Sequence, residues 1–301
     1  MPFRVFFLAA VLSSPAAAQH ADTTATKSAL LAADRALARQ TAKEGPKAVL
    51  HALEPGAAVL FPGQPVLRGA SGSATSFIAR YSRPSTYSWR PVHAVASTDG
   101  RFGCTMGYSR FANAADTAKA EHRGVYLTCW RRGKEGRWRI AGTQLNDSPP
   151  SPPVLADSAT LPRAPHSATT SLQGSALIAA QDADSLFAVF GAQPSGPGPA
   201  FMRYAAADGM LISGDAFPRG PVAIGAVFAE YSPDRVITWR PMRAFGAGSG
   251  GLAFTVGHSV SGPRPGKTGP AIPGKYFSIW RQEPDGRWLY VFDLGSPRPP
   301  R

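Results

Sequence analysis

"GVYLTCWRRGKEGRW" occupies residues 124–138, and "GKYFSIWRQEPDGRW" occupies residues 274–288. The two stretches align without a gap at an offset of 150 residues (274 − 124), with Gly, Tyr, Trp, Arg, Gly, Arg and Trp in the same places. Apolar and aromatic residues fill both arms, and the shared Gly-Arg-Trp follows a turn at which glycine tolerates a positive φ. Each stretch therefore predicts a β-hairpin, and the chain carries that hairpin twice.

The repeat extends upstream of the hairpin. Three further pairs of segments keep the same order at offsets of 150, 150 and 151 residues: Tyr87–Val95 with Ile237–Phe245, Cys104–Arg110 with Phe254–Val260, and Ala58–Gly69 with Gly209–Gly220. A one-residue insertion or deletion between Gly72 and Ile78 explains the change of offset. Repetition over this length predicts two copies of one structural unit.

A change of composition separates the two copies. Asn146–Thr170 is rich in Pro, Ser, Ala and Thr and has no apolar periodicity, which is typical of an extended linker. A chain of 301 residues with 44 % hydrophobic residues is long enough for two cores. We predict one domain over 27–147, a linker over 148–170 and a second domain over 171–297.

Each copy has the pattern of three helices followed by four strands. The helices are expected near 28–42, 46–53 and 71–81, and again near 175–190, 199–206 and 221–231. A short hairpin is expected near 58–61 and 210–213, before the third helix of each copy. The four strands after that helix predict an antiparallel meander, and the whole copy predicts an α+β domain.

The two cysteines indicate the register of the central hairpin. If Cys104 lies opposite Cys129, then Gly103 faces Trp130, a small residue against a large one. Cross-strand complementarity of this kind determines the register of a sheet. We predict a Cys104–Cys129 disulfide, with two reduced buried thiols as the alternative.

The repeated strand has two apolar faces. Tyr276, Ser278 and Trp280 alternate with Phe277 and Ile279, so neither face is suited to solvent. Helices can cover one face, and the sheet of the other copy is the obvious cover for the second. We predict that the copies pack sheet against sheet as an intramolecular pseudo-dimer.

The N-terminus has the pattern of a secretory signal. Arg4 precedes a short apolar run over Val5–Leu12, and Ala16–Ala18 supplies a cleavage signal. The run is too short to span a bilayer, and no later segment approaches the necessary length. We expect a signal peptide over 1–18, cleavage near Ala18, and a periplasmic or secreted protein in which a disulfide is permitted.

The formal net charge of +13 is high, but the basic residues are scattered along the chain. Nucleic-acid binding needs basic residues gathered on one face, so no nucleic-acid partner is expected. Weak attraction to anionic envelope surfaces remains a possible consequence of the charge. No histidine stands at metal-ligand spacing near the cysteines, so we expect neither a metal nor a cofactor.

These motifs resemble the nuclear transport factor 2-like superfamily. The segments "AVLFPGQPVLRG", "WRPVHAV" and "GYS", followed by the opening hairpin, are similar to SnoaL-like and ketosteroid-isomerase-homologue domains of exported bacterial proteins. The tail "GKYFSIWRQEPDGRWLYVFDLGSPRPP" is the closest match to the family pattern. The resemblance implies a cone-shaped domain in which a curved antiparallel sheet wraps a helix and the mouth holds a small-molecule pocket.

The resemblance also places two catalytic positions of the ketosteroid isomerases, and neither holds an acid here. The proton-abstracting base falls at Phe61 or Pro62 in the first copy and at Ser213 in the second. Those enzymes also have a carboxyl that is kept protonated so that it can donate a hydrogen bond, and its position falls at Thr128 and Ser278. That mechanism is therefore not expected.

Some polar and aromatic residues remain candidates for a site. Asp215 and Asp293 are weak candidates for a catalytic acid, since each can equally cap a turn or a chain end. The candidates for pocket walls, which can equally be core residues, are Tyr126, Thr128, Trp130, Tyr276, Ser278, Trp280, Tyr108 and His258.

Three functions follow, in order of preference. The first is a non-catalytic exported module that binds a small apolar ligand or a protein partner. The second is an isomerase-like or SnoaL-like enzyme that uses an acid of the second copy. The third is adhesion to anionic envelope surfaces through the excess of Lys and Arg.

Overall fold

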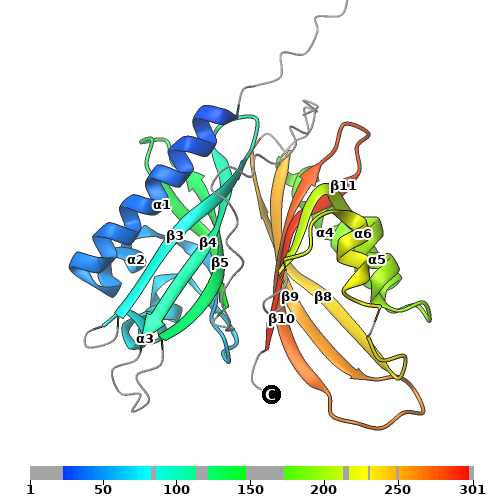
Figure 1. Cartoon of the computed structure of the whole chain (residues 1–301). Helices are drawn as coiled ribbons and strands as arrows, with labels where there is room; N and C mark the ends of the chain where they lie inside the picture. Colours follow the sequence, from blue (N-terminus) through cyan, green and yellow to red (C-terminus); the bar gives the residue numbers. More distant parts are fainter. Residues whose placement is uncertain are drawn as a thin grey trace, which may run out of the picture.

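The computed structural model describes residues 23–82, 86–112, 121–146, 173–212, 217–229, 231–248 and 251–297. The predicted signal peptide over 1–18 and the predicted linker over 148–170 lie outside these ranges. The strands before residue 147 form one sheet and the strands after residue 172 form another. Each sheet has the helices of its own half on its outer face (Figure 1). None of the described helices is both long and apolar enough to cross a membrane.

The first half has three helices and six strands within its described residues. In chain order they are α1 (Thr24–Glu44), α2 (Pro46–Ala52), β1 (Leu53–Leu60), β2 (Val66–Arg68), α3 (Gly69–Tyr81), β3 (Thr86–Ala96), β4 (Phe102–Ala112), β5 (Glu121–Arg132) and β6 (Trp138–Asn146). The strands form one sheet in the order β2-β1-β6-β5-β4-β3. The expected hairpin before the third helix is present as the antiparallel pair β1–β2.

The second half repeats this order with one strand fewer in its described residues. Its elements are α4 (Gln173–Gly191), α5 (Pro197–Tyr204), β7 (Ala205–Ile212), α6 (Gly220–Ala226), β8 (Arg235–Gly246), β9 (Leu252–Pro263), β10 (Ile272–Gln282) and β11 (Trp288–Pro297). The sheet order is β7-β11-β10-β9-β8. Where the hairpin was expected, the described residues on the two sides of 213–216 form an isolated antiparallel bridge between Met210 and Arg219. Helix α6 is shorter than the expected 221–231, because tight turns such as Val227 N–H to Ile224 O follow it.

The predicted antiparallel meander of four strands is confirmed in both halves. The expectation that the whole sheet is antiparallel is wrong, because each sheet also contains one parallel pair. β1 pairs in parallel with β6, with Val59 opposite Thr143, and β7 pairs in parallel with β11, with Leu211 opposite Asp293. A parallel pair needs a long connection between its strands. Here that connection contains the third helix and the strands that follow it. The last strand of each half therefore comes back to lie beside the first strand of that half.

The predicted register of the central hairpin is confirmed. Cys104 lies opposite Cys129 and Gly103 opposite Trp130, and the two cysteines form a disulfide. In the second half, Phe254 lies opposite Ile279. Packing thus takes the place of the covalent bond in that half.

The two faces of each sheet belong to different cores. On the helix side, Trp130 of the first half and Trp280 of the second are buried in separate clusters. On the opposite side, buried residues of both sheets, among them Phe102 and Phe254, belong to a single cluster, and these two rings stack with their centroids 6.2 Å apart. The sheets therefore bury apolar side chains against each other.

Two contacts join the two sheets: Phe254 packs against Gly142, and the buried Lys275 hydrogen-bonds to the first half. Gly142 leaves room for the Phe254 ring, since a Cβ there would come within 2.5 Å of it. Lys275, which is fully buried, donates from Nζ to the carbonyl oxygens of Phe61 and Gln64 in the first half, at 2.6 Å for Gln64. These groups tie β10 to the segment that follows β1.

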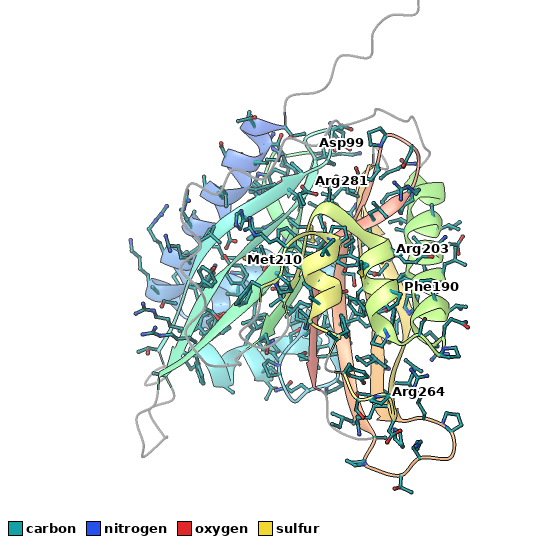
Figure 2. The ribbon with its side chains drawn as sticks, turned by 45° about the vertical axis from the view of Figure 1, so that its right-hand side comes forward. Asp99, Phe190, Arg203, Met210, Arg264 and Arg281 are labelled. Carbon is teal, nitrogen blue, oxygen red and sulfur yellow. A yellow bond between two sulfur atoms is a disulfide. The ribbon has the colours of Figure 1, made fainter. Side chains whose placement is uncertain are left out.

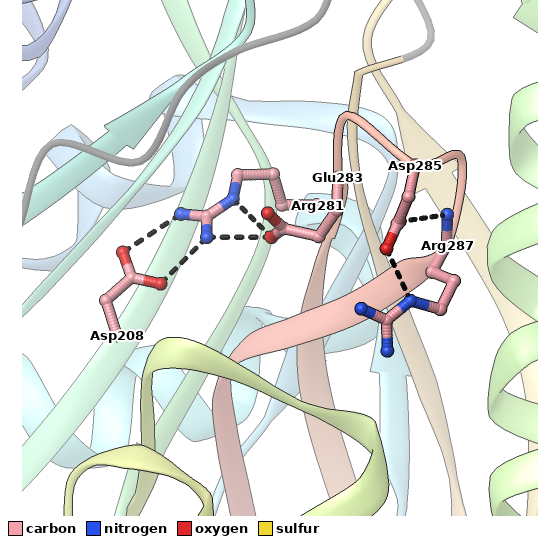
Figure 3. Close-up of polar contacts among 5 residues, drawn as sticks. All are labelled: Asp208, Arg281, Glu283, Asp285 and Arg287. Carbon is pink, nitrogen blue, oxygen red and sulfur yellow. Dashed lines mark hydrogen bonds and ion pairs between the residues drawn. The ribbon is translucent and has the colours of Figure 1, made fainter.

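A buried ion-pair cluster lies at the end of the second sheet where β10 and β11 turn (Figure 3). Arg281 binds the Asp208 carboxylate with two nitrogens at 2.8 and 3.0 Å, and its Nε lies 2.9 Å from Glu283. Burial by itself lowers the pKa of Arg281, but the two carboxylates outweigh it and raise that pKa above its usual value. The cluster holds β10 to the start of β7 and lies outside the site described next.

Candidate functional site

A cavity of about 280 Å³ lies in the second half, between the sheet and the helices α4 and α5. Its apolar walls include Phe187, Phe201, Phe228, Ile237, Trp239 and Ile272, and its polar lining residues are Ser259, Ser261, Tyr276, Asp293 and Ser296. Ser261 and Ile272 flank the loop that contains Arg264, so this end of the cavity lies away from Arg281 (Figure 2). A mainly apolar cavity with few polar groups is typical of small-molecule sites.

Among the described residues, Asp293 supplies the one carboxyl that lines this cavity. It lies on β11 opposite Ser278 of β10, and the Ser278 hydroxyl donates a hydrogen bond to Asp293 Oδ2. Burial raises the pKa of Asp293 to about 6, although the bond from Ser278 acts in the other direction. The group therefore changes between acceptor and donor close to neutral pH.

A second carboxyl supports the cavity wall from behind. The hydroxyl of Tyr276, which lines the cavity, donates to Asp184 Oδ2 of α4 at 2.9 Å. Asp184 is fully buried, and burial raises its pKa to about 7, with the nearby charge of Asp293 adding to the shift. The position of the Tyr276 ring thus depends on a helix residue rather than on the sheet alone.

The first half has an equivalent buried aspartate, Asp34, which accepts one more hydrogen bond than Asp184 does among the bonds to described residues. Asp34 of α1 accepts from the Tyr126 hydroxyl at 2.9 Å and from Trp89 Nε1 at 2.7 Å. In the second half, Trp239 is close enough to lower the pKa of Asp184, but its Nε1 makes no hydrogen bond of normal geometry to any described residue. The indole of the second half is therefore held less firmly, and it lines the larger cavity.

The equivalent cavity of the first half is only about 30 Å³. Leu145 lines it at the position where the second half has Gly295, and Thr143 stands where the second half has Asp293. The hydroxyls of Thr128 and Thr143 hydrogen-bond to each other at 2.8 Å. The small cavity therefore has no carboxyl at the position that Asp293 occupies in the second half. A cavity of this size holds one or two waters and excludes an organic ligand.

The predicted pocket residues are divided between the two cavities. Tyr126, Thr128 and Trp130 line the small one. Tyr276 lines the large one, whereas Ser278 contacts it only through Asp293. Trp280 is a core residue whose Nε1 donates to Thr255 Oγ1 at 2.8 Å.

Two further candidates lie on the opposite face of the sheets. Tyr108 packs against the cluster between the sheets, with its ring centroid 6.4 Å from that of Phe217. His258 follows Val256 by two residues on β9 and therefore shares its face, which is directed at the first sheet. Neither lines the cavities described here. The candidate acid Asp215 lies outside the described residues.

Sequence reasoning missed Asp34, Asp184 and Gly295. The two aspartates stand on apolar helical faces at the offset of 150 residues that runs through the repeat (184 − 34), and that coincidence was the available signal. Gly295 had a weaker signal, the replacement of Leu145 by glycine in otherwise matching strands. Among the described residues, no group of three or more His, Cys, Asp or Glu side chains could hold a metal ion.

The arrangement supports two kinds of chemistry. A buried carboxyl with its pKa near 6 can hydrogen-bond a hydroxyl or a carbonyl group of a ligand. The same group can also take or give a proton, provided that a substrate atom comes within hydrogen-bond distance.

No family model matches the chain, and no curated protein matches it. Among solved structures, it is similar to a ketosteroid isomerase-like protein from Erwinia carotovora atroseptica, at 14% identity over 41% of this chain and 97% of that one, with a TM-score of 0.35. It is also similar to an NTF2-like protein with a cystatin-like fold from Novosphingobium aromaticivorans, at 19% identity over 40% and 80% of the two chains, with a TM-score of 0.35.

A third similarity is to SalBIII, an epoxide hydrolase/cyclase-like enzyme with a role in pyran ring formation in the polyether salinomycin. It has 16% identity over 38% of this chain and 86% of that one, with a TM-score of 0.31. The names of the first two structures, ketosteroid isomerase-like and NTF2-like, are those of the families that the sequence motifs resemble. Function has to be argued from the site, since one fold hosts many functions.

Proposed function

We propose that this chain is an exported binding protein that takes a small apolar ligand into the cavity of its second half. The observation that carries the proposal is the cavity of about 280 Å³, which has aromatic walls and, among the described residues, one lining carboxyl, Asp293. The ligand would lie against Phe187, Phe201 and Trp239 and present one hydrogen-bonding group to Asp293. Burial of its apolar surface would provide most of the affinity.

Within this proposal the first half is a scaffold. The two halves act as cone-shaped domains in an intramolecular pseudo-dimer, because their apolar sheet faces share one core. The signal peptide over 1–18 directs export, and the Cys104–Cys129 disulfide is compatible with an oxidising compartment. The domains extend over 27–147 and 171–297, joined by the linker over 148–170.

The test is binding of the neutral dye N-phenyl-1-naphthylamine, whose fluorescence rises in apolar surroundings. We expect saturable binding by the wild type and its loss in Gly295→Leu. A Cβ at Gly295 has no atom within 4 Å, so leucine enters the cavity without disturbing the backbone, as Leu145 does in the first half. Binding that survives Gly295→Leu, or no binding by the wild type, would contradict the proposal. Native mass spectrometry of protein from its own host would show whether a ligand co-purifies.

An acid–base enzyme is the second candidate, because Asp293 lines the cavity with its pKa near 6. The reaction class would be removal of a proton from the carbon next to a carbonyl group. Exchange of the α-protons of 2-decanone in D₂O, followed by NMR, tests it. Faster exchange with the wild type than with Asp293→Asn, at equal dye binding, would favour the enzyme, and equal rates would exclude Asp293 as the base.

A further inference from the structure

The cavity ends at a cationic side chain. On β8, Arg235, Ile237 and Trp239 alternate along one face, and the last two line the cavity. Across the β8–β9 hairpin, Trp239 pairs with Ser259 and Ile237 with Ser261, and all four residues are lining residues. Arg235 is the next residue on this face, so its guanidinium lies where the lined part of the hairpin ends.

Among the described residues, the guanidinium of Arg235 is anchored through one nitrogen, Nη2. Nη2 donates to Ser261 O at 2.8 Å, to Ser261 Oγ at 3.3 Å and to Pro270 O at 3.2 Å. Within the described part of the chain, no carboxylate pairs with Arg235, and Nε and Nη1 have no acceptor. An arginine has five N–H donors in a planar arrangement. The side of the guanidinium that carries Nε and Nη1 can therefore bind an anionic group.

The surroundings of Arg235 are also basic. Arg264, labelled in Figure 2 at the lower end of the second half, donates to the carbonyl oxygens of Pro233 and Pro194 at 2.9 and 3.4 Å. Lys267 on the same loop is neutralised by Asp234, with Nζ and Oδ1 2.9 Å apart. Two arginines with uncharged partners thus lie at the end of the cavity near the β9–β10 loop.

The inside of the cavity has the opposite character. Its walls are mainly apolar, and among the described residues no Lys, Arg or His lines it and Asp293 is its one carboxyl. An anionic group would be repelled by the Asp293 carboxylate inside and attracted by Arg235 at the end. Both effects favour the same orientation, with the apolar body inside and the anionic group at Arg235.

We propose that the ligand is an amphipathic monocarboxylic acid whose apolar body fills the cavity and whose carboxylate is bound by the free side of the Arg235 guanidinium. This inference rests on the proposed binding function and names its ligand class. In the first half the sequence has Ser85 at the corresponding position, and the cavity there is about 30 Å³, so the site belongs to the second half alone.

Titration calorimetry of the full mature chain with decanoate and with 1-decanol tests the ligand class. The two probes have the same chain length and differ at the head group. We expect the wild type to bind decanoate at least tenfold more tightly than decanol. In Arg235→Gln the preference should fall to below twofold, while the affinity for decanol stays within twofold of the wild type, which also shows that the cavity is intact.

Arg264→Gln is the matched control, because it removes the same charge near the cavity but not from the lined face of β8. It should reduce decanoate affinity by less than threefold. Gly295→Leu should bind neither probe, and decanoate binding that persists in it would place the acid on the basic surface and overturn the proposal. Equal binding of decanoate and decanol would overturn the ligand class and leave the binding function standing. Failure of decanoate, decanol and the neutral dye together would overturn both.

Discussion

Leu145 of β6 and Gly295 of β11 occupy the same place in the two halves, each opposite a tyrosine of the neighbouring strand, Tyr126 or Tyr276. The half with leucine has a cavity of about 30 Å³ and the half with glycine one of about 280 Å³. Glycine is not the whole cause, since the aromatic rings around the small cavity also differ. The comparison shows that one framework can be closed or open depending on a few wall residues.

The framework itself is shared by the two halves. Each has a helix aspartate bonded to a strand tyrosine at 2.9 Å. Each also has a buried tryptophan that donates to the threonine next to Cys104 or next to its counterpart Phe254, Trp130 to Thr105 and Trp280 to Thr255. The duplicated sequence therefore preserved the contacts that position the helix on the sheet, and the walls of the cavity diverged.

The largest expected difference between the halves concerns their corresponding arginines. Arg281→Met should lower the free energy of unfolding by about 3–5 kcal/mol, because Asp208 and Glu283 would be left buried without a cation. Arg131→Met should cost only about 0–1 kcal/mol, because the side chains of Arg131 and Glu54 are 33% and 23% exposed. Chemical denaturation of both variants measures the difference. Similar losses would show that the buried cluster has no special role.

The disulfide should stabilise the first half alone. Replacing Cys104 and Cys129 together by alanine is expected to lower the free energy of unfolding by about 3 kcal/mol, since the bond closes a loop with a sequence separation of 25. The matched control is addition of a reductant to the wild type under the same conditions. A double variant that unfolds at the wild-type denaturant concentration would contradict the prediction.

Asp293 should make stability depend on pH at a position where the first half has Thr143, which does not ionise. Its pKa is raised from 3.8 to about 6 in the folded chain, so the folded state binds more protons between these values and stability falls as pH rises through that window. Asp293→Thr, which copies Thr143, should therefore be more stable than the wild type above pH 6, by up to about 3 kcal/mol.

Chemical denaturation at pH 4 and at pH 8 gives the free energy of unfolding of the variant and of the wild type. The effect is the change, between the two pH values, in the difference between these free energies. Burial also raises the pKa of Asp184 and of Asp34, so these two carboxyls leave some pH dependence in the variant. A wild type that gains stability over the Asp293→Thr variant between pH 4 and pH 6 would contradict the sign of the prediction.

The smallest expected difference concerns the two indoles. Trp89→Phe removes the hydrogen bond from Nε1 to the buried Asp34 and should cost about 1–3 kcal/mol. Trp239→Phe removes an Nε1 that makes no regular hydrogen bond to the described residues, so its loss should be smaller by about 1 kcal/mol. Melting of the two variants side by side gives the comparison. A larger loss for Trp239→Phe would show that this indole does bond to Asp184.

Much of the fold follows from the sequence because it depends on local patterns. The alternation along 274–281 determines which face meets the helices, and the pairing of Gly103 with Trp130 determines the register. The register was predicted by placing Cys104 opposite Cys129, and the match of Gly103 with Trp130 supported that pairing. The parallel pairing of β1 with β6 was not predictable in this way, because it joins strands that are far apart in the sequence.

The site depended on tertiary structure for a different reason. The sequence by itself identified Asp293 as a weak candidate and did not decide between a position that faces a pocket and a cap on the chain end. The volume of that cavity depends on side chains from two helices and several strands at once, and the raised pKa of Asp293 exists only because those elements exclude water from it. Register is a property of neighbouring residues, whereas a cavity and its electrostatics are properties of the assembled walls.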